Sequence, residues 1–298
     1  MRNYTKGISL VVLATLCWAT SSILINLIVR VSGISAVSLA FWRDLTTSVV
    51  LVISILLFRR KLFSINRENL PWLIGMGVIS IGLFHVLWNT SVVLFGASVA
   101  TVLQSNAPIF VTIIARFVFS EPINPRKIAA VAFSVIGTIL SSGITKSGVE
   151  QISTLGLLVA LGSAIAYGTF PLFGRKIAGD TNSWTIMLYA FMFGTLTLLP
   201  FQFGKPLPFP VSSQVSLYFI MFVIISTIGG FGIFTMSLKY LPASIASITA
   251  TTEIVFASIM AYMFLNERLD IWQWIGAAFV ISGVILVSIK NEYTDVPE

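Results

Sequence analysis

Residues 97–121 have the sequence ASVATVLQSNAPIFVTIIARFVFSE, and residues 243–267 have the sequence ASIASITATTEIVFASIMAYMFLNE. The same offset of 146 positions aligns residues 97–142 with residues 243–288 without a gap. This alignment holds 13 identical pairs in 46 positions, whereas chance matching of such apolar sequences gives about 3 or 4. The chain therefore contains an internal repeat.

The composition around this repeat excludes a soluble fold. Of 298 residues, 56% are hydrophobic and only 10% are charged, whereas soluble domains carry about 25% charged residues. The mean hydropathy is +0.96. The apolar residues form continuous runs, which excludes the alternating pattern of a membrane β-barrel. We therefore expect an all-α integral membrane protein.

Apolar runs long enough to cross the ~30 Å hydrocarbon core recur along the whole chain. Ten spans are predicted, at 7–29, 36–58, 71–93, 97–119, 126–145, 155–174, 184–203, 215–238, 243–265 and 271–289. Each copy of the repeat then holds five spans, and because five is odd, the second copy enters the membrane from the opposite face. The sequence predicts ten transmembrane helices as two inverted five-helix repeats, with domains at 1–146 and 147–298. Inverted repeats are typical of secondary transporters that work by alternating access.

Basic residues predict the orientation of these spans. Twelve of the 18 Lys and Arg fall in loops on the side of the termini, and four fall on the other side. By the positive-inside rule, we expect both termini in the cytoplasm and the protein in the cell (plasma or inner) membrane. Charges scattered singly do not predict nucleic-acid binding. We expect a monomer whose partners are the lipid bilayer and a small-molecule substrate, because two repeats already close a site between them.

Residues in both halves form a pattern that is typical of one transporter family. They are Gly7, Trp18, Ala19, Thr20, Arg43, Pro108, Glu121, Gly137, Glu267 and Gly283. On this pattern, and over essentially its whole length, the chain resembles the drug/metabolite transporter superfamily, specifically EamA-type ten-helix transporters with two EamA domains. The resemblance implies export of amino acids or related metabolites, with cationic or aromatic drug-like compounds as the alternative. Second repeats of the family usually carry a proline where this chain has Ile254, so a kink is less expected there.

Glu253 is the eleventh residue of the 23-residue span 243–265, so it is predicted to lie near the bilayer midplane. An ionised carboxylate is costly there and usually marks function. Glu253 is therefore a candidate proton carrier, and its neighbour Thr252 is a candidate substrate-binding residue. The alternative is that Glu253 caps backbone groups or bonds a neighbouring helix.

The span 71–93 carries a polar face. His85, Trp88 and Asn89 are spaced i, i+3 and i+4, so they share one side of a helix. Such a face is too polar for lipid, and we expect all three to line a central cavity and contact substrate. His85, the only histidine, is also a candidate proton relay. The alternative is a set of interhelical hydrogen bonds.

Polar and aromatic residues of other spans complete the predicted substrate site. Gln104 and Asn106 precede Pro108, whose ring frees a backbone carbonyl, and kinked helices hold binding groups in transporters. Trp18 and Tyr167, aligned at an offset of 149, lie deep in their spans and not at the interface where such residues usually lie. Helix packing is the alternative role for each. The predicted substrate-binding residues are Trp18, Thr20, His85, Trp88, Asn89, Gln104, Asn106, Tyr167 and Thr252.

Arg43 and Asp44 are adjacent charges in the span 36–58. Adjacent helical residues point about 100° apart, so the two side chains are not expected to face one neighbour. We expect at least one of them to pair across helices, as a gating or structural ion pair. Arg43 is the one basic residue clearly internal to a span. This disfavours phosphorylated substrates, which need several such residues.

The sequence lacks the motifs of an enzyme or of an ATP-driven pump. It contains no HExxH, GxSxG or Walker motif, and we expect no cofactor and no metal. A channel or facilitative pore is the alternative from another class. Channels need rings of charged or carbonyl groups, and one buried acid in one half makes no such ring. A secondary transporter is therefore the favoured function.

Overall fold

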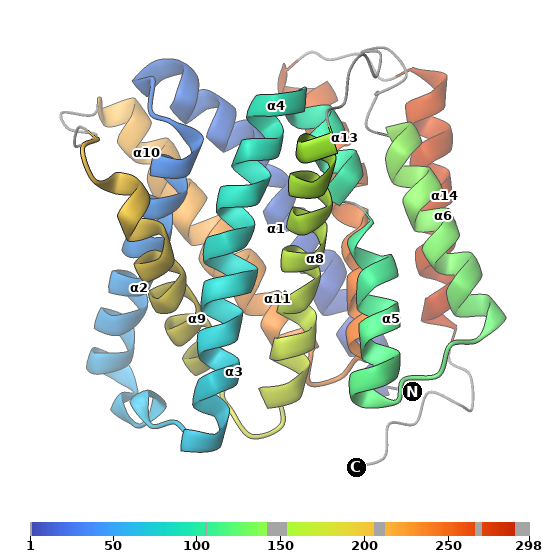
Figure 1. Cartoon of the computed structure of the whole chain (residues 1–298), viewed down its shortest axis with the longest axis horizontal. Coiled ribbons are helices and arrows are strands. Elements are labelled where there is room, and N and C mark those ends of the chain that lie inside the picture. Colours follow the sequence, from blue (N-terminus) through green and yellow to red (C-terminus); the bar gives the residue numbers. More distant parts are fainter. Residues whose placement is uncertain (1, 105, 142–153, 206–211, 266–269, 290–298) are drawn as a thin grey trace.

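The computed structural model describes residues 2–104, 106–141, 154–205, 212–265 and 270–289 (Figure 1). Helices account for 88% of the structure, and the described ranges contain no strand. This confirms the predicted all-α fold. Eight helical stretches in these ranges are long and apolar enough to cross a membrane.

The helices of residues 2–141 are joined by short turns. They are α1 (Arg2–Ser32), α2 (Ala36–Phe58), η1 (Arg60–Phe63), η2 (Arg67–Asn69), α3 (Leu70–Gly75), η3 (Met76–Leu83), α4 (Phe84–Gln104), α5 (Ala107–Phe119) and α6 (Pro125–Ser141). Ser35 caps α2, because its hydroxyl accepts a hydrogen bond from the Ser38 N–H at 3.2 Å. The short polar turns thus start and stop helices that are otherwise apolar.

The second part of the chain has a similar order of elements. They are α8 (Thr154–Ile177), α9 (Ser183–Leu198), η4 (Leu199–Gln202), α10 (Ser213–Met221), η5 (Phe222–Phe231), α11 (Gly232–Ser237), α12 (Ala243–Ala250), α13 (Thr252–Leu265) and α14 (Ile271–Ser288). The π-helical segments η3 and η5 begin at Met76 and Phe222, which are 146 residues apart. The offset of the sequence repeat therefore recurs in the local backbone geometry.

A helix break also occurs at the same place in each copy of the repeat. α4 ends at Gln104 and α12 ends at Ala250, 146 residues later. Pro108 accounts for the first break, because it lacks the N–H that would donate to the Gln104 carbonyl and its ring crowds that carbonyl. The second break needs no proline, since the Thr251 hydroxyl donates to the Ile248 carbonyl at 2.6 Å and satisfies the end of α12. The helix is interrupted in this half although a kink was less expected there.

Predicted span boundaries differ from the structure around α4. Residues 94–96, predicted as a loop, lie inside α4, because a single glycine in a helix removes no backbone hydrogen bond. The predicted span 97–119 is consequently divided between α4 and α5. α5 has 13 residues, whereas a full crossing needs about 20. Within the described ranges, eight helical stretches are long and apolar enough to cross a membrane.

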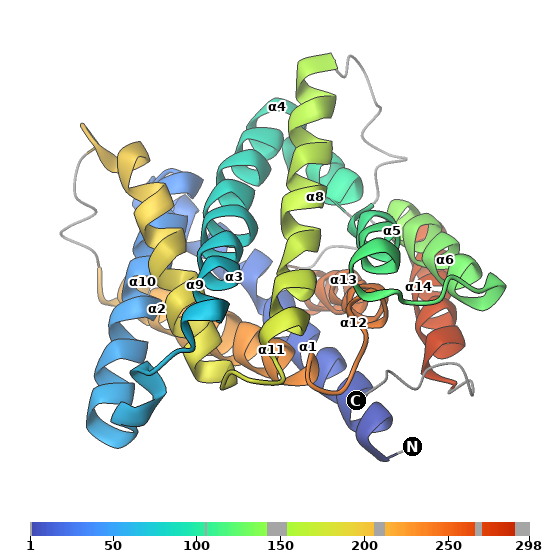
Figure 2. The ribbon, with the colours of Figure 1, turned by 60° about the horizontal axis from the view of Figure 1, so that its bottom comes forward.

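α6 and α14 lie side by side and pack backbone to backbone (Figures 1 and 2). A Cβ added at Gly276 would lie 2.6 Å from the Gly137 carbonyl oxygen, and one at Gly283 would lie 2.9 Å from the Ala130 carbonyl oxygen. Residues early in one helix thus meet residues late in the other, so the two helices run antiparallel. The repeat aligns Gly137 with Gly283 and Ala130 with Gly276, which makes the two contacts equivalent.

Two aromatic rings lie at the centre of this interface. Phe133 of α6 and Phe279 of α14 have ring centroids 5.3 Å apart in an edge-to-face arrangement. The repeat aligns these two residues with each other. A residue that contacts its own equivalent is typical of contacts related by a two-fold axis.

Replacing Gly276 with Ala is expected to lower the stability of the folded protein by about 1–3 kcal/mol. The added methyl group would lie 2.5 Å from the Ser141 backbone nitrogen and would push α6 and α14 apart. Gly179→Ala is the matched control, since nothing lies within 4 Å of a Cβ at that position. Thermal unfolding in detergent, followed by tryptophan fluorescence, measures the difference. Equal unfolding midpoints for the two variants would contradict the close packing.

The rest of the structure separates a core from a surface suited to lipid. Phe191 and Met187 of α9 pack with Met76 of η3, and all three are at most 1% exposed. Phe58 and Phe117 are 81% and 83% exposed. Large apolar side chains on the outside are unfavourable in water, but in a bilayer they face hydrocarbon.

Candidate substrate cavity

A cavity of about 250 Å³ is lined by residues from both halves of the chain. The lining residues are Trp18, Ser21, Ile25, Arg43, Phe84, His85, Trp88, Gln104, Ala107, Pro108, Thr138, Tyr167, Phe231, Ser247, Ala250, Thr251, Glu253, Ile254 and Ala257. Pockets for drug-sized ligands enclose about 300–1,000 Å³. The cavity therefore has room for a small metabolite.

Both helix breaks border this cavity. Gln104, Ala107 and Pro108 line it from the first break, and Ala250 and Thr251 line it from the second. Helix ends carry backbone N–H or carbonyl groups that lack partners within the helix. Discontinuous helices of this kind hold substrates and ions in secondary transporters. The cavity can therefore offer backbone polar groups in addition to side chains.

Glu253 lies in the first turn of α13 and lines the cavity. Among the described residues, its carboxylate has no hydrogen-bond or ion-pair partner. The positive end of the helix dipole favours a negative charge in the first turn, which offsets part of its desolvation cost. Tyr167 also lines the cavity and is close enough to interact electrostatically with Glu253. An unpaired carboxylate in a cavity can bind either a proton or a cationic group.

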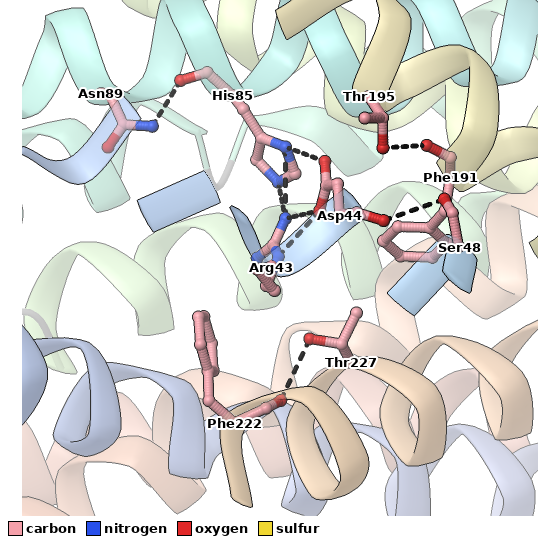
Figure 3. Close-up of polar contacts among 9 residues, drawn as sticks. All are labelled: Arg43, Asp44, Ser48, His85, Asn89, Phe191, Thr195, Phe222 and Thr227. Atoms are coloured by element: carbon pink, nitrogen blue, oxygen red, sulfur yellow. Dashed lines mark hydrogen bonds and ion pairs between the residues drawn. The ribbon is translucent and has the colours of Figure 1, made fainter. Parts of the chain in front are cut away.

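Arg43, Asp44 and His85 form a buried polar cluster (Figure 3). Arg43 Nη2 lies 2.8 Å from Asp44 Oδ1 and 2.5 Å from His85 Nε2, and His85 Nδ1 lies 3.2 Å from Asp44 Oδ2. A guanidinium group only donates hydrogen bonds, so Nε2 of His85 accepts from Arg43. A neutral imidazole with its proton on Nδ1 supplies the lone pair that this contact needs. With that tautomer, the charges of Arg43 and Asp44 cancel within the cluster.

This geometry differs from the expectation for two adjacent charges. Arg43 and Asp44 were not expected to face one neighbour, but both contact His85. The Arg43 side chain is long enough to fold back, and its Nε donates to Asp44 Oδ1 at 2.9 Å. Arg43 Cζ also lies 5.4 Å from the ring centroid of Phe222 in η5. The cluster thus connects α2 and α4 with the second half of the chain.

Five of the nine predicted substrate-binding residues line the cavity, namely Trp18, His85, Trp88, Gln104 and Tyr167. The Trp18 ring packs against Phe231 and Phe234, with centroid distances of 5.0 Å to each. Within the described part of the chain, the Trp18 indole N–H is buried without a hydrogen-bond partner. Leaving a buried donor unpaired is costly, and this nitrogen is packed against η5, since a Cβ added at Gly230 would lie 2.6 Å from it.

Thr20 and Thr252 do not line the cavity but connect helices. Thr20 Oγ1 lies 2.6 Å from Ser226 Oγ in η5. Thr252 Oγ1 lies 2.8 Å from Thr15 Oγ1 in α1. These hydroxyl pairs hold α1 against the second half of the chain, so both residues have packing contacts in place of the predicted contact with a cavity.

Asn89 and Asn106 also lie outside the cavity lining. The Asn89 amide donates to the His85 carbonyl at 2.6 Å, and the Asn106 amide donates to the Leu103 carbonyl at 2.9 Å. Each amide therefore bonds to the backbone of its own helix or helix end. Asn106 does so at the first break, where its backbone N–H donates to the same Leu103 carbonyl at 3.3 Å.

Sequence reasoning missed a row of lining residues in the second half. Ser247, Ala250, Thr251 and Ile254 all line the cavity. They are spaced i, i+3, i+4 and i+7, which places them on one helical face. The sequence-based prediction names Glu253, which also lines the cavity, and Thr252, which does not. The small and hydroxyl-bearing residues of this row are the signal that could have identified the other lining residues.

Residues 5–143 and 154–289 each match the model of the EamA-like transporter family. The chain belongs to this family. The match covers two repeats and confirms the resemblance to the drug/metabolite transporter superfamily. Together with the apolar helices, it identifies a multi-pass membrane protein.

Relatives of this EamA-like transporter extend over most of its length. "Uncharacterized inner membrane transporter YicL" of Salmonella typhimurium is 25% identical over 98% of this chain and 98% of its own. Proteins of Escherichia coli and Salmonella typhimurium, each named "Probable amino-acid metabolite efflux pump", are 22% and 24% identical over 76% of this chain and 79% of theirs. A protein of known crystal structure has a TM-score of 0.79 at 15% identity, covering 94% of this chain and 96% of that chain, which shows a shared fold.

The positions that carried the resemblance to EamA-type transporters divide into two groups in the structure. Trp18, Arg43 and Pro108 line the cavity. Glu121 and Gly137 lie outside it, in contacts between the two halves. Some of the residues typical of the family therefore line the cavity, and others hold the two halves of the chain together.

Proposed function

We propose that this EamA-like transporter is a secondary transporter that exports amino acids or related small metabolites by alternating access, in exchange for protons. The observation that carries the proposal is that both helix breaks border one cavity, which contains one unpaired carboxylate, Glu253. The names of the related efflux pumps support the substrate class. We expect neither enzymatic activity nor a cofactor.

The proposed architecture is ten transmembrane helices in two inverted five-helix repeats, residues 1–146 and 147–298. The antiparallel packing of α6 against α14 supports it, since equivalent helices of inverted copies must run in opposite directions. The helix breaks, which lie 146 residues apart, support the repeat itself. The distribution of Lys and Arg supports cytoplasmic termini. Because both halves of one chain line the cavity, we propose that the protein works as a monomer.

An amino acid carries an ammonium group and a carboxylate, and the cavity offers a partner for each. Glu253 would pair with the ammonium group, and Trp18, Trp88 and Tyr167 would add cation–π contacts. The N-terminal end of α5, which begins at Ala107, would favour the substrate carboxylate through the positive end of its helix dipole. The neutral Arg43 cluster would form a fixed wall.

Proton coupling would follow from competition at Glu253. A proton arriving from outside neutralises the Glu253 carboxylate, so the substrate ammonium group loses its counter-charge and the substrate leaves. When the cavity next opens to the cytoplasm, the proton dissociates and the carboxylate can bind another substrate. Each cycle then exports one substrate and admits one proton.

Cationic aromatic compounds are a second candidate substrate class. Asp44 neutralises Arg43, so an ionised Glu253 leaves the cavity lining with a net negative charge. Aromatic side chains form much of the wall, namely Trp18, Phe84, Trp88, Tyr167 and Phe231. Transport of amines that lack a carboxylate would distinguish this class from amino acids. Such amines would bind Glu253 but would not need the N-terminal end of α5.

Flux measurements in proteoliposomes test the proposed function. Vesicles with an acidic interior are incubated with radiolabelled amino acids and aromatic amines, with and without a protonophore. We expect at least one amino acid to accumulate in a gradient-dependent manner. A channel would equilibrate the solute without accumulation, and accumulation of amines alone would favour the second class. Movement of no panel member would contradict the proposal.

A further inference from the structure

A buried carboxylate outside the cavity connects the two halves of the chain. Glu121 follows Ser120, the C-cap of α5, and is 7% exposed. Its Oε1 accepts a hydrogen bond from the Ala243 N–H at 2.8 Å, and its Oε2 accepts one from the Ser244 hydroxyl. Lys127 Nζ of α6 donates to the same Oε2 at 3.4 Å. We call these four residues the Glu121 cluster.

Local backbone geometry directs Glu121 toward α12. Ser120 ends α5 with φ of 55°, and it is the one non-glycine residue with positive φ in the described part of the chain. This left-handed conformation is disfavoured for serine. The residue before α12 is Pro242, whose side chain supplies no capping hydrogen bond. The first N–H groups of α12 need such an acceptor, and Glu121 supplies it from the other half of the chain.

The Glu121 cluster lies at the far end of α12 from the cavity. α12 begins at Ala243 in the cluster and reaches the cavity lining at Ser247. The side chain of Ala243, a member of the cluster, packs against the buried side chains of Val111, Ala115 and Leu172. These contacts between α5, α8 and α12 form an apolar layer between the cluster and the cavity.

The chain just before α12 is held at the same end of the molecule. Arg175 Nη1 of α8 donates to the Leu238 carbonyl at 2.8 Å. Lys6 Nζ of α1 donates to the Tyr240 hydroxyl at 3.0 Å. Lys6, Lys127 and Arg175 all belong to the set of basic residues on the side of the termini, which the positive-inside rule assigns to the cytoplasm.

We propose that Glu121 holds the cytoplasmic end of the cavity closed, and that this end opens when Glu121 separates from α12. The proposal rests on the alternating-access function proposed above. Opening requires α5 and α12 to part, so the Ala243 N–H and the Ser244 hydroxyl must exchange the carboxylate for water. Glu121 is therefore a positioning residue, which acts on the accessibility of the cavity and does not contact the substrate.

Accessibility of a single cysteine tests this role without any knowledge of the substrate. Cys17 is replaced by Ser, and Ser247→Cys places a thiol in the cavity lining on α12. A membrane-impermeant maleimide is applied to the cytoplasmic face in inside-out vesicles. In this background, Glu121→Gln is expected to raise the labelling rate about tenfold, the effect of one lost hydrogen bond to a charged group. Labelling from the opposite face is expected to fall.

A milder variant and a matched control keep the result interpretable. Ser244→Ala removes one donor to Glu121 and is expected to raise labelling in the same direction, even if Glu121→Gln folds poorly. Glu68→Gln alters an exposed carboxylate and is expected to leave the rate unchanged. Unchanged labelling in folded Glu121→Gln and Ser244→Ala proteins would overturn the proposal. Absence of amino-acid flux would instead concern the proposed function, because the labelling assay measures access alone.

Discussion

Replacing Glu253 with Gln is expected to abolish proton-driven accumulation of substrate in proteoliposomes. With the membrane potential clamped and a gradient of about one pH unit, one-for-one exchange sustains about tenfold accumulation, and the variant is expected to reach only equilibrium. Glutamine keeps the size of the side chain but binds no exchangeable proton. Exchange of internal for external substrate is expected to need higher substrate concentrations than in the unmodified protein, because glutamine offers the ammonium group no counter-charge.

Tyr167→Phe is the matched control for this experiment. Tyr167 lines the cavity and interacts electrostatically with Glu253, but the substitution leaves the carboxylate in place. Gradient-driven accumulation is therefore expected to survive in this variant. If Glu253→Gln accumulates substrate as well as the unmodified protein does, Glu253 is not the proton site, and His85 becomes the residue to test.

Replacing Arg43 with Ala is expected to lower the stability of the folded protein by about 3–5 kcal/mol. Asp44 is fully buried, and Arg43 supplies its positive partner at 2.8 Å. Removing the guanidinium group leaves a buried carboxylate whose remaining neighbour is the neutral His85 ring, at 3.2 Å. The yield of monodisperse protein and its unfolding midpoint in detergent measure the loss.

A double substitution separates the missing charge from the missing side-chain volume. Arg43→Gln combined with Asp44→Asn replaces both charged groups with neutral amides and is expected to be more stable than Arg43→Ala, because no buried charge is left unpaired. A double variant no more stable than Arg43→Ala would show that packing of Arg43 against Phe222, and not charge pairing, maintains the cluster.

The fold class was predictable from the sequence because lipid imposes a simple rule. A continuous apolar run must satisfy its backbone hydrogen bonds internally, so runs such as 36–58 and 155–174 had to be helices. Helix breaks that lie within a continuous apolar run were harder to locate from the sequence. Gly96 was interpreted as a loop and lies within α4, whereas the break at Thr251 depends on a hydroxyl bonding a carbonyl.

The lining of the cavity was predictable only in part. Helical spacing correctly grouped His85 and Trp88 on a face that lines the cavity, but their neighbour Asn89 turns its amide to the backbone of its own helix. Spacing gives the direction of a side chain from the helix axis and not the identity of the helix opposite. For the same reason, the contact of His85 with both Arg43 and Asp44 had no signal in the sequence.

The contact between Phe133 and Phe279 has a consequence for the ancestry of the chain. A surface that meets its own equivalent is self-complementary. Two identical polypeptides, each corresponding to one half and inserted in opposite orientations, could therefore associate through the same rings and glycines. Gene duplication and fusion would then have joined partners that already fitted, and only afterwards could one copy acquire Glu253 while the other kept Pro108.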